Sequence, residues 1–312
     1  MPSDFQPQED RPYVEKAVAA LGTNHTFLEI DTSDLLDNLY TAVDAKGLPG
    51  MGDIDSSILA FLKKIKPTHG SFLTGEGADE VFGGYPWFRR PELTTGDIFP
   101  WSRNIEVRES FLEEELRKIL GLKEYTEMRY KESLSNAPLQ EGETDRERRL
   151  RQVYYLNTQW FMSTLVDRTQ RAAYFLGMYP RMPYANVDMV EYVYNVPWSI
   201  KTENGIIKYP LRKAFEGRLP QELVYRKKSP FPKTYNPSYT NALAQRLKDE
   251  VLQPNAPIFP FIDPQKVMNL HTKDAGPWFG QLMQGPQQMA YLIQVNYWLK
   301  KFNVEYKAPI KN

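Results

Sequence analysis

The stretch "GSFLTGEGADEVFGGY" (70–85) joins a short apolar segment to a glycine-rich turn with three carboxylates. The apolar part, "GSFLT", is typical of a buried strand. The pattern before it reads helix, strand, helix, helix, and this segment adds a second strand. That order predicts a parallel α/β architecture, in which the turn lies at the carboxyl end of a strand. Ligands of open α/β sheets usually bind at that end.

The sequence before this stretch defines the expected elements. Apolar spacing predicts a helix over residues 9–22, which stops at Gly22. "TFLEI" (26–30) is expected to form a short strand, and a second helix is expected to start at the capping residues 31–34 and to continue through Ala45. A third helix follows Asp53.

Beyond about residue 100 the apolar spacing becomes helical. Helices are expected near residues 105–120, 143–176, 187–195, 208–216, 237–252 and 286–302. Proline-rich loops join them, and no repeat of fixed period is found. We therefore expect a single domain over residues 1–312, with an α/β part over about 1–100 and a mainly helical part over about 101–312.

Composition excludes several classes of protein. The 312 residues include 39 Lys plus Arg and 39 Asp plus Glu, so the formal net charge is zero and no nucleic-acid partner is indicated. There are no cysteines, which excludes disulfides and thiolate sites within this sequence. No apolar run approaches the ~18 residues of a membrane span, and the first residues lack an apolar signal region. We expect a cytoplasmic chain with no membrane partner.

The carboxylates Glu76, Asp79 and Glu80 are closely spaced within the turn. Such groups stay ionised together only near a cation, near hydrogen-bond donors or when geometry separates them. Mg²⁺ bound to carboxylate and nucleotide phosphate is one common solution. Gly75 and Gly77 would let the backbone approach a ligand. The alternative is a solvated acidic loop that starts a helix.

Two basic clusters follow much later in the chain, "IIKYPLRKAFEG" (206–217) and "VYRKKSPFPK" (224–233). Lys208 belongs to the first, and Lys228 and Lys233 belong to the second. Lysines of this kind could neutralise a polyphosphate leaving group. The alternative is a solvated basic face.

Arg168 and Arg171 have the i, i+3 spacing that shares one helical face. They could hold a substrate carboxylate bidentately. They could equally pair with Asp167 and Asp188 as part of the structure. The spacing alone leaves both interpretations open.

"LTGEGADEVFGGY" (73–85) closely resembles the signature of the asparagine synthase (glutamine-hydrolysing) family, Ser-Gly-Glu-Gly-Ala/Ser-Asp-Glu. Four further stretches resemble the synthetase half of that family, in the expected order: "PGMGDIDSSILAF", "KYPLRKAF", "YRKKSPFPKTYNPSY" and "PWFGQLMQGPQQMAYLIQVNYWL". The resemblance covers nearly the whole chain. It implies a parallel sheet of the ATP-pyrophosphatase (adenine nucleotide alpha hydrolase-like) type, here incomplete, that merges into a mostly helical C-terminal region.

The resemblance also implies an activity. In the family, ATP adenylates the side-chain carboxylate of aspartate and releases pyrophosphate. Ammonia then attacks the β-aspartyl-AMP, which gives asparagine and AMP. ATP and Mg²⁺ would be the cofactors, and aspartate and ammonia would be the further partners.

The family's functional residues can be carried over to matching positions. Glu76 would assist the attack of ammonia as a base, and Lys208 would stabilise the departing pyrophosphate. Asp79 would bind Mg²⁺, and Arg168 and Arg171 would orient the acidic substrate. The nucleotide and its pyrophosphate would be held by Thr74, Gly75, Gly77 and Lys228.

The sequence departs from the family pattern in three places. It contains neither the cysteine nucleophile of the family's glutaminase domain nor the phosphate loop Ser-Gly-Gly-Xaa-Asp-Ser that follows the family's first strand. Tyr179 and Asn186 replace an acidic residue on either side of Arg181. We therefore expect a synthetase-type chain that lacks the glutaminase domain and strand one with its loop.

A separate glutaminase and phosphate-loop polypeptide, or a homo-oligomer, would then complete the enzyme. Two alternatives stay open. The chain could be a catalytically inactive remnant or an assembly subunit, or it could resemble related cyclases that form an amide from another carboxylic acid.

Overall fold

The computed structural model describes residues 10–228, 236–271, 276–279 and 283–306. The chain divides into two compact units, each built from three segments. Unit 1 comprises residues 1–29, 68–100 and 126–232, and unit 2 comprises residues 30–67, 101–125 and 233–312. The single domain expected from the sequence, with its change of character near residue 100, stays a prediction. In the part of the chain that the structure describes, no helix has the length and apolar character needed to cross a membrane.

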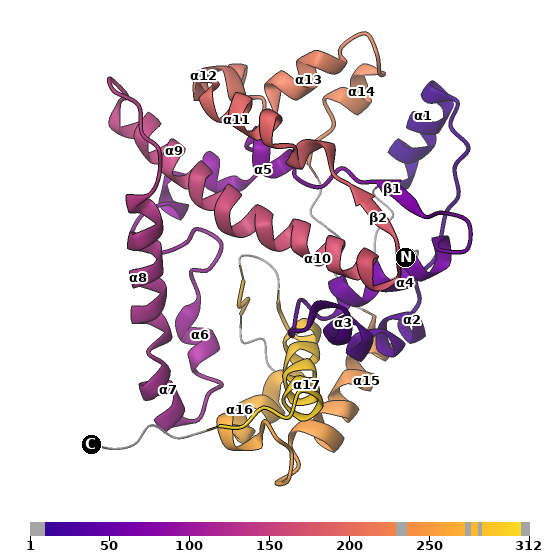
Figure 1. The fold of residues 1–312 in the computed structure, drawn as a ribbon, viewed down its shortest axis with the longest axis vertical. Coiled ribbons are helices and arrows are strands. Elements are labelled where there is room, and N and C mark those ends of the chain that lie inside the picture. The colour runs from indigo at the N-terminus through magenta and orange to yellow at the C-terminus, as the bar shows by residue number, and fades with distance from the viewer. Residues whose placement is uncertain (1–9, 229–235, 272–275, 280–282, 307–312) are drawn as a thin grey trace. The chain divides into compact units, whose positions relative to one another are not determined.

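Unit 1 contains a small parallel sheet among helices (Figure 1). Strand β1 (Ser71–Leu73) pairs with β2 (Tyr179–Arg181), and Phe72 lies opposite Pro180. The α/β class expected from the sequence is therefore confirmed as a mostly helical chain with a parallel pair of strands. The helices of unit 1 are α1 (Arg11–Leu21), α5 (Ala78–Phe82), α9 (Asp145–Leu156), α10 (Ser163–Phe175), α11 (Val187–Asn195), α12 (Trp198–Lys201), α13 (Tyr209–Phe215) and α14 (Gln221–Val224).

Two expectations about strands were wrong. The segment 26–30 has no strand, and Phe27 instead packs against the Arg11 guanidinium, which lies 4.6 Å from the ring centroid. β1 is a strand as expected but is not buried, because its first and last residues are exposed and Leu73 keeps 75% of its surface. Side chains of a strand alternate between two faces, so one face of this short sheet is open.

The segment expected to be helical near residues 143–176 is one continuous helical run (Figure 1). A π-helical segment, Asn157–Met162, joins α9 to α10. Thr144 begins the run with a capping box in which its side chain and that of Glu147 each bond the other's backbone. The run places Arg168 and Thr169 on α10, which packs against β2.

Among its described residues, unit 2 consists of helices joined by loops, with one isolated antiparallel bridge between Leu112 and Ile262. Asp31 caps its first helix in a capping box with Asp34, as expected, but the helix ends early, at Asp37. Asn38 interrupts it, because its side chain takes the carbonyl of Asp34 at 2.7 Å. The helices of unit 2 are α2 (Thr32–Asp37), α3 (Leu39–Lys46), α4 (Asp53–Ile65), α6 (Ile105–Glu109), α7 (Glu114–Leu120), α15 (Pro237–Arg246), α16 (Pro264–Met268) and α17 (Pro286–Lys301).

The helix α8 (Leu122–Ser135) begins in unit 2 and ends in unit 1. It was not among the helices expected from the sequence.

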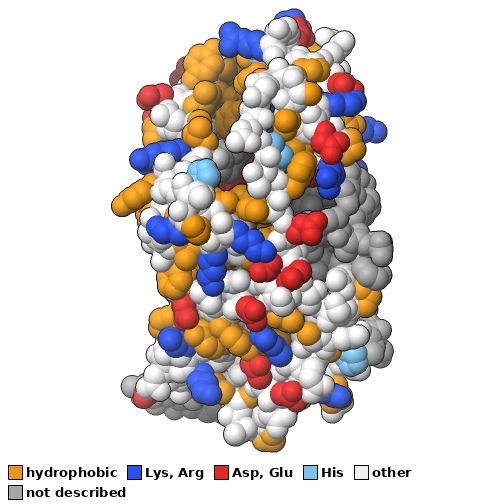
Figure 2. Space-filling model, turned by 90° about the vertical axis from the view of Figure 1, so that its right-hand side faces the viewer, with side chains coloured by type: hydrophobic (Ala, Val, Ile, Leu, Met, Phe, Trp, Pro, Cys, Tyr) orange, Lys and Arg blue, Asp and Glu red, His pale blue; other side chains and the backbone are white. Residues whose placement is uncertain are grey.

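Charged side chains of both signs lie among hydrophobic ones on the face drawn in Figure 2. That face has no broad area of a single sign, in keeping with the formal net charge of zero.

Candidate functional site

The carboxylate turn leaves the carboxyl end of β1 and enters α5. Thr74 still bonds the sheet, because its N–H donates to the carbonyl of Arg181 at 3.0 Å. Its hydroxyl then accepts the N–H of Glu76 at 3.3 Å. Gly77 has a φ of 94°, in the left-handed region that favours glycine, and forms the N-cap of α5. The turn is therefore built from local hydrogen bonds and one conformation that requires glycine.

The short helix α5 is anchored by its apolar side chains. Val81 and Phe82 are buried in a cluster with Met162 and Val193. Those two residues come from the π-helical segment and from α11. The turn is thus held against two other elements of unit 1, and its carboxylates start from a fixed backbone.

Asp79 is the centre of a charged cluster. Its two oxygens form ion pairs with Lys208 at 2.8 Å and with Lys228 at 2.9 Å. Burial acts to raise the pKa of Asp79, but the two lysines outweigh it and the pKa is lowered. Gly84 makes room for this cluster, since a Cβ there would lie 1.8 Å from Asp79 Oδ1 and 2.7 Å from Lys208 Cε.

Arg212 links the two segments that carry Lys208 and Lys228. The Arg212 guanidinium donates to the carbonyl of Ile207 at 2.8 Å and to the carbonyl of Arg226 at 3.0 Å. Lys208 itself has a φ of 56°, which is unusual for a residue with a side chain, and it caps α13. Strained backbone of this kind often occurs at functional sites.

Glu76 points to a different set of partners. Its Oε1 accepts from the hydroxyl of Thr169 at 2.9 Å and from Arg168 Nη2 at 3.4 Å. Its Oε2 is buried and has no hydrogen-bond partner among the residues that the structure describes. One oxygen of this carboxylate is therefore fixed, and none of the described residues hydrogen-bonds the other.

Glu80 lies in a third environment. It is 2% exposed and accepts a hydrogen bond from the Tyr85 hydroxyl. Burial raises the pKa of Glu80, and the neighbouring Asp79 charge adds to the effect. The three carboxylates of the turn thus coexist because each faces a different partner.

The other expected site residues are placed as follows. The backbone at Gly75 faces open space, since an added Cβ would meet nothing within 4 Å. Arg171 lies on the exposed side of α10, where its Nε contacts Asp167 at 2.7 and 2.8 Å. This is the structural pairing that the sequence had left open. Lys233 lies outside the described residues.

The replacements on either side of Arg181 have simple structural settings. Asn186 caps α11 through its side-chain oxygen, which accepts the N–H of Met189 at 3.2 Å. An asparagine serves this capping function as well as an aspartate. Tyr179 is 57% exposed in β2 and contacts the ring of Tyr174 edge-on.

The donor chemistry of the turn fits Mg²⁺ only together with phosphate. No group of three histidine, aspartate or glutamate side chains that could hold a metal occurs among the described residues. Asp79 offers one carboxylate, and both of its oxygens contact lysines. Mg²⁺ is often held by one or two carboxylates plus substrate phosphates. Phosphates bound here would also attract the two lysines away from Asp79, which would free its oxygens for the metal.

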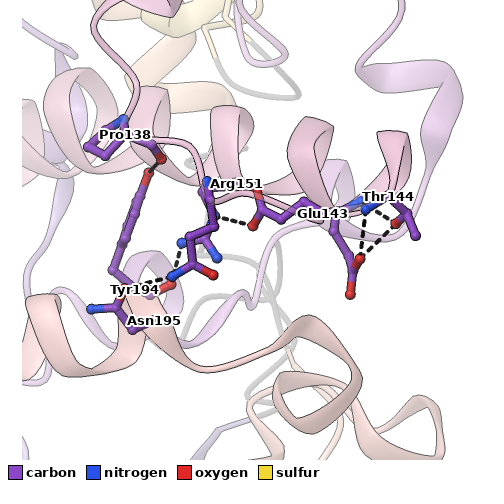
Figure 3. Close-up of polar contacts among 8 residues, drawn as sticks. Pro138, Glu143, Thr144, Arg151, Tyr194 and Asn195 are labelled. Atoms are coloured by element: carbon purple, nitrogen blue, oxygen red, sulfur yellow. Dashed lines mark hydrogen bonds and ion pairs between the residues drawn. The ribbon is translucent and has the colours of Figure 1, made fainter.

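Sequence reasoning missed two hydrogen bonds to the carboxylates of the turn and one buried cluster. Neither Thr169 nor Tyr85 was singled out, because a single hydroxyl carries no spacing signal. The cluster surrounds Arg151, whose side chain pairs with Glu143 and donates to the carbonyl of Tyr194 at 3.2 Å (Figure 3).

Lys201 belongs to the same region of unit 1. It is 1% exposed, and its Nζ lies 4.4 Å from the ring centroid of Tyr154 and 4.8 Å from that of Trp198. Burial lowers the pKa of Lys201 to about 7, and the Arg151 charge contributes to this shift. Trp198 also reaches the turn, since a Cβ on Gly83 would lie 2.8 Å from its ring.

Comparison with known proteins identifies the family. The family model described as asparagine synthase matches residues 3–300. The chain belongs to the asparagine synthase family. It is 42% identical over 307 residues to the glutamine-hydrolysing asparagine synthetase 3 of Bacillus subtilis (strain 168), a match that covers 97% of this chain and 50% of that protein.

More distant members are also similar. The root asparagine synthetase of Pisum sativum is 25% identical over 266 residues, which is 78% of this chain and 35% of the pea protein. The glutamine-hydrolysing asparagine synthetase 1 of Arabidopsis thaliana is 26% identical over 259 residues. The chain spans about half the length of the Bacillus relative and about a third of the plant relatives.

Proposed function

We propose that this chain carries the amide-forming part of an ATP-dependent asparagine synthetase. Its substrate would be aspartate, activated as β-aspartyl-AMP, with ammonia as the nucleophile. The observation that carries the proposal is the Asp79 cluster, in which Lys208 and Lys228 lie within 2.9 Å of one carboxylate at the end of a parallel strand. An ATP-pyrophosphatase type of sheet is part of the same proposal.

The residues divide between two half-reactions. In the first, Lys208 and Lys228 leave Asp79 for the phosphates and neutralise the charge that develops on departing pyrophosphate. Asp79 would hold Mg²⁺ with those phosphates, and the metal would supply further charge neutralisation. Gly75, whose surroundings are open, lets the backbone approach the nucleotide.

In the second half-reaction, ammonia attacks the activated carbonyl. Glu76 accepts the proton that the nitrogen releases, and none of the described residues hydrogen-bonds the Oε2 that would take it. Arg168 lies beside Glu76 and would orient the acidic substrate. Arg171 would join it only after it leaves Asp167.

The family's phosphate loop and its ammonia source would come from a partner polypeptide, because this sequence contains neither the loop nor the cysteine. The sheet supports such an association, because among the described residues β1 and β2 pair only with each other, so each has an unpaired edge, and Leu73 is 75% exposed. An exposed strand edge is a ready template for pairing with another chain.

An ATP–pyrophosphate exchange assay with aspartate tests the proposal. The chain would be assayed alone and together with a polypeptide that contains the phosphate loop. We expect aspartate-dependent exchange in at least the second preparation, and Asp79→Asn should suppress it. Absence of exchange in both preparations would overturn the proposed function and favour an assembly subunit without catalysis.

The identity of the acid substrate needs a separate experiment. Arg171, which was expected to orient an acidic substrate, is paired with Asp167 in this structure. A panel of carboxylic acids would be screened for AMP formation under the same conditions. Aspartate should give the highest rate. A higher rate with a different acid would favour a related amide-forming cyclase.

A further inference from the structure

Thr169 makes an unusual contact for a hydroxyl within a helix. It is 5% exposed in the middle of α10, and its Oγ1 donates to Glu76 Oε1 at 2.9 Å. Threonines in helices commonly bond a carbonyl of their own helix. Thr164, on the same helix, does this, because its hydroxyl donates to the carbonyl of Trp160 at 2.7 Å. Thr169 is directed instead to a carboxylate on the turn.

The contact selects one oxygen of Glu76. Thr169 and Arg168 both contact Oε1, while Oε2 is buried and has no hydrogen-bond partner among the described residues. The Arg168 contact is long, at 3.4 Å, so the hydroxyl makes the shorter bond. Because threonine is branched at Cβ, few orientations are open to its hydroxyl within a helix. The carboxylate plane of Glu76 is therefore set mainly from α10.

We infer that Thr169 is a positioning residue for Glu76, which fixes Oε1 so that Oε2 meets the nucleophile. This inference rests on the proposed function. In the amide-forming step the ammonia nitrogen bonds to the carbonyl carbon, and the bond from that carbon to the AMP oxygen breaks. AMP leaves with the electron pair, and the proton released from nitrogen goes to Glu76 Oε2.

The two half-reactions give different expectations for a variant without the hydroxyl. Adenylation does not use the Glu76 proton acceptor, so Thr169→Val should keep ATP–pyrophosphate exchange within about twofold of wild type. Amide formation should fall roughly 10- to 100-fold, the range that follows from losing a hydrogen bond to a charged group. Thr169→Ser restores the hydroxyl and should recover most of the amide-forming rate.

The experiment measures both half-reactions in the preparation in which wild type exchanges pyrophosphate, with ammonium chloride as the nitrogen source. Thr164→Val is the matched control, because it removes a hydroxyl from the same helix without touching Glu76. Selective loss of amide formation in Thr169→Val, with rescue by serine and an unaffected Thr164→Val, supports the inference.

Three results would overturn it. Thr169→Val could form the amide at the wild-type rate, or lose both half-reactions equally, or not be rescued by serine. Failure of the proposed function looks different, because wild type itself would then exchange no pyrophosphate. That result would remove the basis for any role of Thr169 in this reaction.

Discussion

Two lysines of unit 1 occupy opposite environments. Lys208 is largely buried and forms an ion pair with Asp79 at 2.8 Å. Lys201 is almost completely buried between the rings of Tyr154 and Trp198, and among the described residues no carboxylate forms an ion pair with it. Arg151, whose charge acts on Lys201, forms its own ion pair with Glu143 (Figure 3).

The difference shows that the partner, and not burial alone, decides the charge state. The two lysines around Asp79 lower the pKa of that carboxyl, which favours its ionised form. Burial without a carboxylate lowers the pKa of Lys201 to about 7. Aromatic faces attract an ammonium group but do not replace the water that it has lost.

Removing the charge of Lys201 should have the largest effect on stability. The folded-state pKa of about 7 lies below the ordinary 10.5, so the unfolded chain binds the proton more strongly between those values. The cost of this lysine is therefore complete below pH 7 and disappears as the pH rises to 10.5. Lys201→Met should raise the free energy of unfolding by roughly 4 kcal/mol at pH 6, and by progressively less at higher pH.

Urea unfolding of both proteins at pH 6, 8 and 10 measures this gain. Lys213→Met is the control, because Lys213 is exposed and pairs with Glu216. It should change stability by less than about 0.5 kcal/mol. A gain for Lys201→Met that did not depend on pH would show that packing, and not charge, limits this site.

The second prediction compares the activities of the two lysine variants and not their stabilities. Lys208→Met should lower ATP–pyrophosphate exchange by roughly 10²–10³-fold, because one charge aimed at the leaving group is lost. Lys201→Met should leave exchange near the wild-type rate at pH 8. Equal losses in the two variants would mean that exchange reports on folding, and the contrast between the lysines would fail.

The next prediction compares the stabilities of two glycine variants of the turn. Gly84→Ala places a Cβ 1.8 Å from Asp79 Oδ1 and should destabilise the protein by about 1–3 kcal/mol. Gly75→Ala meets no atom within 4 Å and should change stability by less than about 0.5 kcal/mol. Thermal unfolding measures both. If Gly75 lies against the nucleotide as proposed, its alanine variant should still show a raised KM for ATP.

The smallest expected effect concerns the third carboxylate of the turn. Tyr85→Phe removes the hydroxyl that donates to Glu80 and should cost about 1–2 kcal/mol at pH 7, where an ionised Glu80 would lack this donor. The cost should shrink as the pH falls, because protonation removes the charge that needs the donor. A cost that stayed constant down to pH 4 would contradict this account of Glu80.

Local signals in the sequence predicted much of the fold. Gly22 adopts the left-handed conformation at the end of α1, and Asp31 forms its capping box, since both depend on residues a few positions away. The strand at 26–30 failed because a strand needs a hydrogen-bonded neighbour that no local pattern supplies. Exposure of β1 depends on what covers it, and this too lies outside the segment itself.

The residues of the candidate site likewise fall into those that the sequence predicted and those that only the tertiary fold reveals. Lys208 was singled out from its motif, and the structure brings it to Asp79 across more than a hundred residues of sequence. The roles of these residues stay predictions. Thr169, Tyr85 and Lys201 could not be found from spacing, because each depends on which side chain the tertiary fold places opposite it.

One guanidinium ties together the two segments whose lysines pair with Asp79. Arg212 bonds the carbonyl next to Lys208 and the carbonyl two residues before Lys228. A shift of one segment would therefore strain a hydrogen bond to the other. The two ammonium groups that meet at Asp79 thus share one backbone support, although they come from separate turns of the chain.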